Sequence, residues 1–225
     1  MMLKELREQV YEANMDLPKH GLVVFTWGNA SQVDRERGLF VIKPSGVDYD
    51  ELSPENMVVC DFDGNKVEGD LNPSSDTATH AYLYKMWDNI GGVVHTHSSH
   101  AVSWAQAGRS IPCYGTTHAD HFYGEIPCTR SMMRHEIEDD YERETGRLIV
   151  ETFSRTDPSD VPGVLVCAHG PFTWGADPIE AAKNAVVLEE VAFMGWHVVA
   201  IRSDLEPIER PLLDHHFRSK HGEDA

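Results

Sequence analysis

The sequence predicts a single α/β domain in which helices cover a sheet, and three observations support this fold class. The chain has 225 residues, of which 41% are hydrophobic and 25% are charged, which suits one larger domain with a sizeable core. Strand-like and helix-like segments are interspersed along the whole chain. No internal repeat, low-complexity run or linker rich in proline and serine divides it. We therefore expect residues 1–225 to form one domain.

Five short apolar segments have the composition of buried strands. Because strands and helices are interspersed along the chain, we expect the strands to form a sheet that the helices cover. The predicted strands are residues 22–26, 39–42, 57–60, 92–97 and 164–168.

Six segments have helical character, and two of them have clear ends. The N-terminal helix is amphipathic and is expected to end at Pro18. The longest helix has Asp177 as a predicted N-cap and Pro178 at its first position, with apolar residues at helical spacing behind them. The predicted helices are residues 3–15, 77–87, 101–107, 134–141, 145–154 and 178–197.

The charge of the chain argues against nucleic acid and membrane partners, and other features of the sequence indicate where the protein is located. Lys+Arg 19 against Asp+Glu 37 gives a net charge of −18, which repels nucleic acid and anionic membranes. The apolar segment 185–201 contains Glu189 and Glu190, so we do not expect it to span a membrane. No secretory signal is visible, and no CxxC pair occurs, which favours buried thiols in a reduced cytoplasm. The cysteines are Cys60, Cys113, Cys128 and Cys167.

Histidine occurs 13 times, and one pair has the spacing of metal ligands. His95 and His97 follow Val93 and Val94, which favour a strand. Residues two apart on a strand point to the same face, so both imidazoles would project together near the end of the strand. This arrangement is common in zinc sites. The alternative is two solvated or core histidines.

Two further residues could complete such a site. His169 ends another apolar, strand-like run, so it could be the third ligand or a structural histidine. Three histidines would leave one position open, as a catalytic zinc site requires. Asp76 could supply a displaceable oxygen ligand, although its local sequence favours the N-cap of a helix.

Three short loops are rich in groups that bind anions. Glycine allows the backbone to approach a ligand closely, and serine hydroxyl and backbone N–H groups suit phosphate oxygens. Lys43 adds a positive charge that the acidic surface lacks. Each segment alone could be an ordinary turn, but together with a metal site they indicate a small phosphorylated substrate. The candidate residues are Gly28, Asn29, Lys43, Ser45, Gly46, Ser74 and Ser75.

A polar stretch near the middle of the chain contains one candidate general acid/base. His118, Asp120 and His121 lie in the segment GTTHADHFYG, which we expect to be irregular. Asp120 could transfer protons. A solvated loop carboxylate is the alternative.

Considered together, these motifs resemble the L-ribulose-5-phosphate 4-epimerase family of the class II aldolase/adducin superfamily. The resemblance extends from about residue 3 to about residue 222 and keeps the order of the motifs. They are LPKHGLVVFTWGNAS, VIKPSGVDY, PSSDTATH, GGVVHTHSSHA, GTTHADHFYG, IPCTR, GVLVCAHGPFTWG and LLDHHFRSKHG.

The resemblance implies a fold, a metal and a set of roles. It implies an α/β/α arrangement around a largely antiparallel sheet, a divalent metal that is usually zinc with manganese or similar ions as substitutes, and a phosphorylated ketopentose as substrate. It also implies a homotetramer with active sites at the subunit interfaces. The C-terminal tail from about residue 214 is then expected at an interface, where His216 reaches the site of the neighbouring subunit. Asp120 matches the catalytic acid/base, and the loop residues match the substrate-binding positions. The implied metal-binding residues are Asp76, His95, His97 and His169.

One departure from the family pattern leaves the second acid/base group open. Family members have a tyrosine beyond the KHG motif that partners Asp120, whereas this sequence reads Gly222-Glu223-Asp224-Ala225. Either further residues follow, or another group acts as the second acid/base.

The resemblance also implies a reaction, the cleavage and re-formation of the C3–C4 bond of the substrate, because the C4 hydrogen is not acidic. The alternatives are a class II aldolase that releases its fragments and a non-catalytic, adducin-like interaction module. The pentose pathway, L-arabinose breakdown or a related route, stays open.

Overall fold

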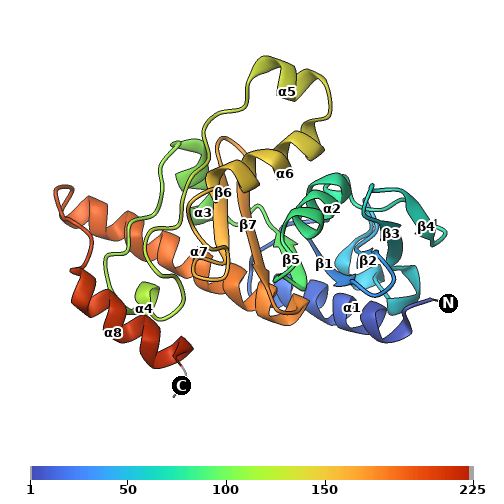
Figure 1. Ribbon diagram of the computed structural model, residues 1–225, viewed down its shortest axis with the longest axis horizontal. Coiled ribbons are helices and arrows are strands. Elements are labelled where there is room, and N and C mark those ends of the chain that lie inside the picture. Colours follow the sequence, from blue (N-terminus) through green and yellow to red (C-terminus); the bar gives the residue numbers. More distant parts are fainter. Residues whose placement is uncertain (1, 223–225) are drawn as a thin grey trace.

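A computed structural model describes residues 2–222 (Figure 1). Helices are interspersed with strands along the chain, as predicted. The helices are α1 (Lys4–Lys19), α2 (Thr77–Met86), α3 (Ser99–Gln106), α4 (Thr116–Ala119), α5 (Arg134–Glu138), α6 (Tyr141–Thr152), α7 (Pro178–Ile201) and α8 (Arg210–His221), with short 3₁₀ helices at Tyr49–Glu51 and Pro54–Asn56.

The strands form one sheet in the order β4-β3-β2-β1-β5-β7-β6, and every neighbouring pair is antiparallel. Figure 1 shows α2 and α6 on one face of this sheet and α1 and α7 on the other. The expected α/β/α arrangement with a largely antiparallel sheet is therefore confirmed. The strands are β1 (Asn29–Asp34), β2 (Leu39–Ile42), β3 (Val58–Asp61), β4 (Lys66–Glu68), β5 (Gly92–His95), β6 (Gly163–Val166) and β7 (Gly170–Gly175).

Alternation along the central strands divides the core between the two faces. Phe40 and Ile42 of β2 pack in the cluster that contains α2, whereas Val41 packs in the cluster that contains α1. Successive side chains of a strand point to opposite faces, so a wholly apolar strand such as LFVI is buried on both sides.

Some predicted elements were wrong. Residues 22–26 form a turn rather than a strand; Leu22 is apolar because it packs under α1, and Phe25 has a left-handed φ of 54°. The first strand, β1, instead begins at Asn29. It was not predicted because its polar residues were not expected to be buried. The strand predicted over residues 164–168 ends earlier, at Val166, and the next strand, β7, begins at Gly170. Helix α1 continues through Pro18 to Lys19.

Helix α7 packs on the central strands of the sheet and also contacts the start of α3. Its N-cap was predicted correctly, since the Asp177 side chain accepts a hydrogen bond of 2.8 Å from the Glu180 N–H. In length and mean hydropathy (1.4) it also resembles a membrane-spanning helix. However, its apolar face packs on β5 and β7, and the Glu189 carboxylate accepts hydrogen bonds of 2.9 Å from the N–H groups of His100 and Ala101. These contacts attach the helix to the sheet and to the start of α3.

The cap of α7 yields a stability prediction. We expect Asp177→Ala to lower the free energy of unfolding by about 1 kcal/mol, because one helical N–H loses its acceptor. Urea unfolding followed by circular dichroism measures this change. Glu190→Ala, on the exposed side of the same helix, is the matched control and should change stability by less than about 0.5 kcal/mol. Equal losses in the two variants would show that the cap is not the cause.

Candidate metal centre

Three histidines from two adjacent turns meet at one end of the inner strands β5 and β7. His95 is the last residue of β5, His97 lies two residues beyond the strand, and His169 lies in the turn between β6 and β7. Since β5 pairs with β7, the sheet brings these turns together. One ring nitrogen from each histidine lies within 4.8 Å of the others. The prediction that both His95 and His97 lie on the strand was right only for His95.

Neighbouring groups orient the imidazoles. The Nδ1 of His95 lies 2.9 Å from the Pro171 carbonyl oxygen, to which it can only donate, and its ring stacks on Phe172 at 4.2 Å. The Nδ1 of His169 lies 3.2 Å from the Tyr141 hydroxyl. The Nε2 atoms of His95 and His97 are 3.1 Å apart. Oxygen partners on the far ring nitrogens are typical of metal-binding histidines, so this donor set fits a divalent cation such as zinc.

The charge states also suit a cation. Burial, with a smaller effect of His95, lowers the pKa of His169 to about 4 and lowers the pKa of His97. Both imidazoles are therefore neutral near pH 7, which is the form that binds metals.

Asp76 occupies the predicted N-cap position of α2 but does not cap the helix. Its Oδ2 instead accepts a hydrogen bond of 2.7 Å from the Asn29 amide. Burial raises the pKa of Asp76, but His95, His80 and this hydrogen bond outweigh it and hold the pKa below its usual value. An ionised carboxylate therefore lies beside the three histidines.

A cavity of about 350 Å³ opens from these residues. Backbone hydrogen bonds join two of its loops: Ser45 N–H to Asn72 O at 2.9 Å, and Ser74 N–H to Lys43 O at 3.0 Å. All seven predicted loop residues line it together with Asp76, His95 and His97. The lining residues are Thr26, Trp27, Gly28, Asn29, Lys43, Pro44, Ser45, Gly46, Ser74, Ser75, Asp76, His95 and His97.

Gly28 allows the first of these loops to contact the end of β5. It has a φ of 85°, and a Cβ atom there would lie 2.8 Å from Val23 Cγ1 and 2.9 Å from the His95 carbonyl oxygen. Only glycine fits this position. Trp27, the next residue back, was not among the predicted site residues; it is half exposed, and its ring centroid lies 6.1 Å from that of His97.

Lys43 is buried behind the loops. Its ammonium group donates hydrogen bonds to the carbonyl oxygens of Val47 (3.0 Å) and Pro44 (3.3 Å), and it lies 4.9 Å from the centre of the Tyr49 ring. Burial lowers its pKa to about 8, against a smaller opposing effect of Asp48. Lys43 thus holds the loop backbone and places a positive charge next to the cavity.

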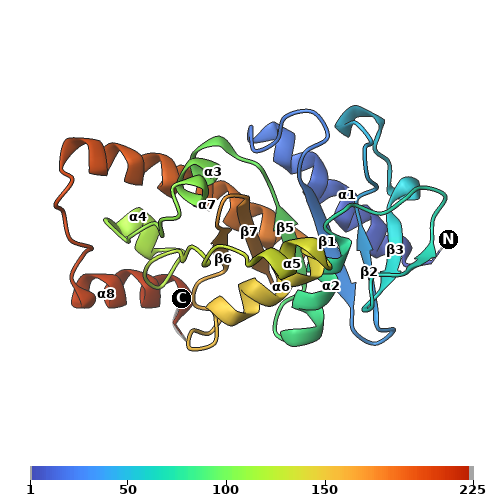
Figure 2. The same ribbon diagram turned by 90° about the horizontal axis from the view of Figure 1, so that it is seen from above.

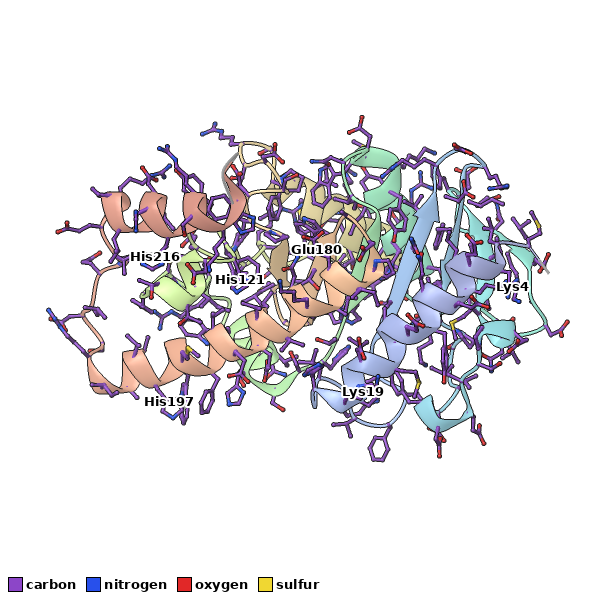
Figure 3. All side chains as sticks on the ribbon, turned by 90° about the horizontal axis from the view of Figure 1, so that it is seen from below. Lys4, Lys19, His121, Glu180, His197 and His216 are labelled. Atoms are coloured by element: carbon purple, nitrogen blue, oxygen red, sulfur yellow. The ribbon has the colours of Figure 1, made fainter. Side chains whose placement is uncertain are left out.

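Asp120 lies in another part of the chain. It follows α4, and its carboxylate is 2.9 Å from Nδ1 of His216 on α8, while its carbonyl oxygen is 3.0 Å from Nε2 of His221. Figures 1 and 2 place α4 and α8 together and apart from β5, and Figure 3 shows His216 beside the segment that contains His121. A single chain thus pairs Asp120 with His216 and does not bring Asp120 into the lining of the cavity.

Comparisons with known proteins agree with this architecture. Residues 8–196 match the Class II Aldolase and Adducin N-terminal domain family. The chain is 55% identical over 223 residues to the L-ribulose-5-phosphate 4-epimerase UlaF of Salmonella paratyphi C and to that of Salmonella typhi, covering 99% of this chain and 98% of each relative.

Solved structures show the same fold at lower identity. An L-fuculose 1-phosphate aldolase matches with a TM-score of 0.79 and 21% identity over 94% of each chain. An aldolase II superfamily protein from Pseudomonas syringae matches with a TM-score of 0.78 and 17% identity, over 97% of this chain and 85% of that one. The family match, the near full-length relatives and the shared fold agree, and the chain belongs to the class II aldolase and adducin N-terminal domain family.

Proposed function

We propose that this protein is a metal-dependent L-ribulose-5-phosphate 4-epimerase that interconverts L-ribulose 5-phosphate and D-xylulose 5-phosphate. The observation that carries the proposal is the cluster of His95, His97 and His169, with Asp76 beside it, at a cavity lined by small polar loops. The 55% identity to enzymes of that name, over almost the whole chain, supports this substrate. Zinc is the proposed metal, because three imidazoles are a common ligand set of catalytic zinc.

The proposed reaction breaks and re-forms the C3–C4 bond. A base removes the proton of the C4 hydroxyl, the C3–C4 electrons move into an enediolate of dihydroxyacetone, and glycolaldehyde phosphate forms. A divalent cation would act as a Lewis acid that stabilises the enediolate charge. The loops that contain Ser45, Gly46, Ser74 and Ser75 retain the phosphate while the aldehyde turns. Addition to its other face inverts C4, and the new C4 oxygen is protonated.

The two proton transfers require groups beyond the metal cluster. We assign one of them to Asp120, as predicted from the resemblance, and leave the second open. Because Asp120 pairs with His216 away from its own chain's cavity, we propose a homotetramer in which these residues approach the cavity of a neighbouring subunit. In this proposal the C-terminal segment from about residue 214 lies at the interface, residues 1–225 form one domain, and the protein works in the cytoplasm.

A class II aldolase that releases its fragments is the second candidate, favoured by the fold shared with L-fuculose 1-phosphate aldolase. A non-catalytic role like that of adducin is less well supported, since the chain retains the whole histidine cluster.

A coupled assay distinguishes these functions. We expect the purified protein to convert L-ribulose 5-phosphate into D-xylulose 5-phosphate, to lose activity with a chelator and to regain it with zinc or manganese. Net release of dihydroxyacetone or glycolaldehyde phosphate would favour the aldolase. Freshly purified protein without bound metal or turnover would favour the interaction module.

The assignment of Asp120 yields a kinetic prediction. Asp120→Asn should lower kcat by about 10²–10⁴-fold, because the amide cannot transfer the C4 hydroxyl proton. Metal content, measured by atomic absorption, should remain that of the wild type. If the variant loses its metal, Asp120 has a structural role in the site instead.

The buried amine of Lys43 yields a pH prediction. Its pKa is near 8, so the amine is charged below pH 8 and becomes neutral above it. Attraction to the substrate phosphate should weaken accordingly, and KM should rise several-fold between pH 7 and 9. Lys43→Met should have a high KM that no longer changes across this range, whereas Lys66→Met, on the distant strand β4, should behave as the wild type. A wild-type KM that is constant from pH 7 to 9 would contradict this role.

A further inference from the structure

Helix α8 is attached to the segment that contains Asp120 by only a small apolar contact. Among the described residues of α8, Leu213 alone is buried, and it packs with Cys113 and Ala119. The helix packs mainly against α4, which directly precedes Asp120. Apolar burial is not directional, so one buried leucine does not fix the rotation of a helix about its own axis. Polar contacts therefore determine which side chains α8 presents to Asp120.

Three side chains form a closed set of hydrogen bonds between the two segments. The Tyr123 hydroxyl donates to Oδ1 of Asp214 at 2.6 Å, and Nε of Arg210 donates to the same oxygen at 2.7 Å. Nη2 of Arg210 also donates to the Tyr123 hydroxyl, and the guanidinium carbon lies 4.4 Å from the centre of the tyrosine ring. Hydrogen bonds to charged groups are stronger than those between neutral groups. We call Tyr123, Asp214 and Arg210 the Tyr123 cluster.

Aromatic contacts extend this attachment along one face of α8. The residues of that face are three or four positions apart, as neighbours on a helix surface are. They are Arg210, Asp214, Phe217 and His221. The centre of the Phe217 ring lies 4.7 Å from that of Tyr123 and 4.3 Å from that of His221. Nε2 of His221 lies 3.0 Å from the Asp120 carbonyl oxygen. One face of α8 is thus bound to residues 120–123 along its whole length.

The Tyr123 cluster adjoins the pair of Asp120 and His216 in both segments. Tyr123 follows Asp120 by three residues, and Asp214 precedes His216 by two. The Asp120 carboxylate lies 2.9 Å from Nδ1 of His216, but the two side chains are 26% and 30% exposed. A contact between partly exposed groups is weak by itself, because water competes for both partners. The geometry of this pair therefore depends on how α8 is held.

We propose that Tyr123 is a positioning residue: its hydroxyl, bound by Asp214 and Arg210, holds α8 so that His216 orients the Asp120 carboxylate. This inference rests on the proposed function, in which Asp120 transfers a proton and approaches the cavity of a neighbouring subunit. Because that cavity belongs to another chain, each chain has to hold its own Asp120 and His216 in the reactive geometry. A small misplacement of a reacting group can lower turnover by about 100-fold.

The first test measures kcat with L-ribulose 5-phosphate as substrate. Tyr123→Phe and Asp214→Ala should each lower kcat by about 10–100-fold. KM and metal content should stay those of the wild type, because the polar loops and the histidine cluster lie elsewhere. Asp214→Asn keeps an acceptor oxygen for Tyr123 and should retain much of the wild-type kcat. Tyr11→Phe is the matched control and should have the wild-type kcat, since Tyr11 lies on α1, which Figure 3 shows apart from His216.

A double-mutant cycle separates positioning from a general loss of stability. If Tyr123 acts only through the pair, Tyr123→Phe should cause no further loss of kcat in a His216→Asn background. Losses that multiply would overturn the proposal, because Tyr123 would then act independently of His216. A wild-type kcat in either single variant would also overturn it. A loss in Tyr123→Phe without a loss in Asp214→Ala would mean that the hydroxyl takes part in the reaction directly, which contradicts a positioning role.

Hydrogen–deuterium exchange tests the attachment of α8 without turnover. The amides of residues 210–221 should exchange faster in Tyr123→Phe than in the wild type or in Tyr11→Phe. Unchanged exchange would show that other contacts hold the helix and would refute the inference. If Tyr123→Phe does not fold, as judged by circular dichroism, Asp214→Ala replaces it in the cycle and in the exchange measurement. Wild-type protein that shows the expected exchange but no epimerase activity would instead refute the proposed function, and with it this role of Tyr123.

Discussion

The register of three antiparallel strands determines the geometry of the candidate site. His95 lies opposite Asn29 on β1 and opposite Phe172 on β7. The first pairing brings the Asn29–Asp76 contact next to the imidazole, and the second provides the stacking ring and the turn that contains His169. A shift of one residue would reverse the direction of every side chain on the moved strand, so the ligand set could not form. The close approach of Gly91 and Gly92 to the start of α7 supports this register, because a Cβ atom at Gly92 would lie 2.4 Å from the backbone of Asp177.

Electrostatics explain how an acidic chain can attract an anion at this place. The net charge of −18 repels phosphates over most of the surface. Burial keeps His97 and His169 neutral, while the surrounding groups keep Asp76 ionised, so the cluster is suited to a cation. A bound divalent cation and the amine of Lys43 would together reverse the local sign of the potential. The loops around Lys43 add N–H and hydroxyl donors, and among the described residues that line the cavity Asp76 alone is acidic.

Much of the fold and most of the candidate site could be predicted from local sequence, and the failures share a cause. Apolar strands such as 39–42 and the capped helix α7 were found because their patterns are local. Strand β1 was missed because Asn29 and Ser31 are polar, and only their partners at the start of α2 and along it (Asp76, His80 and Tyr84) make such residues acceptable in a core. The same omission hid His80 and Tyr84. Tyr141 could not be linked to His169 either, because that contact joins residues 28 positions apart.

The metal cluster alone does not separate the epimerase from the aldolase. Both reactions cleave a bond next to a carbonyl group, and both need a Lewis acid and a phosphate site. An epimerase must also retain the aldehyde and return a proton on its opposite face, so the distinguishing groups lie on the aldehyde side of the cavity. In the proposed mechanism these groups come from the segment GTTHADHFYG and helix α8, which are joined by the contact between Asp120 and His216. In one chain this pair lies apart from the cavity beside the histidine cluster, which is why the proposed function requires the two parts to meet between subunits.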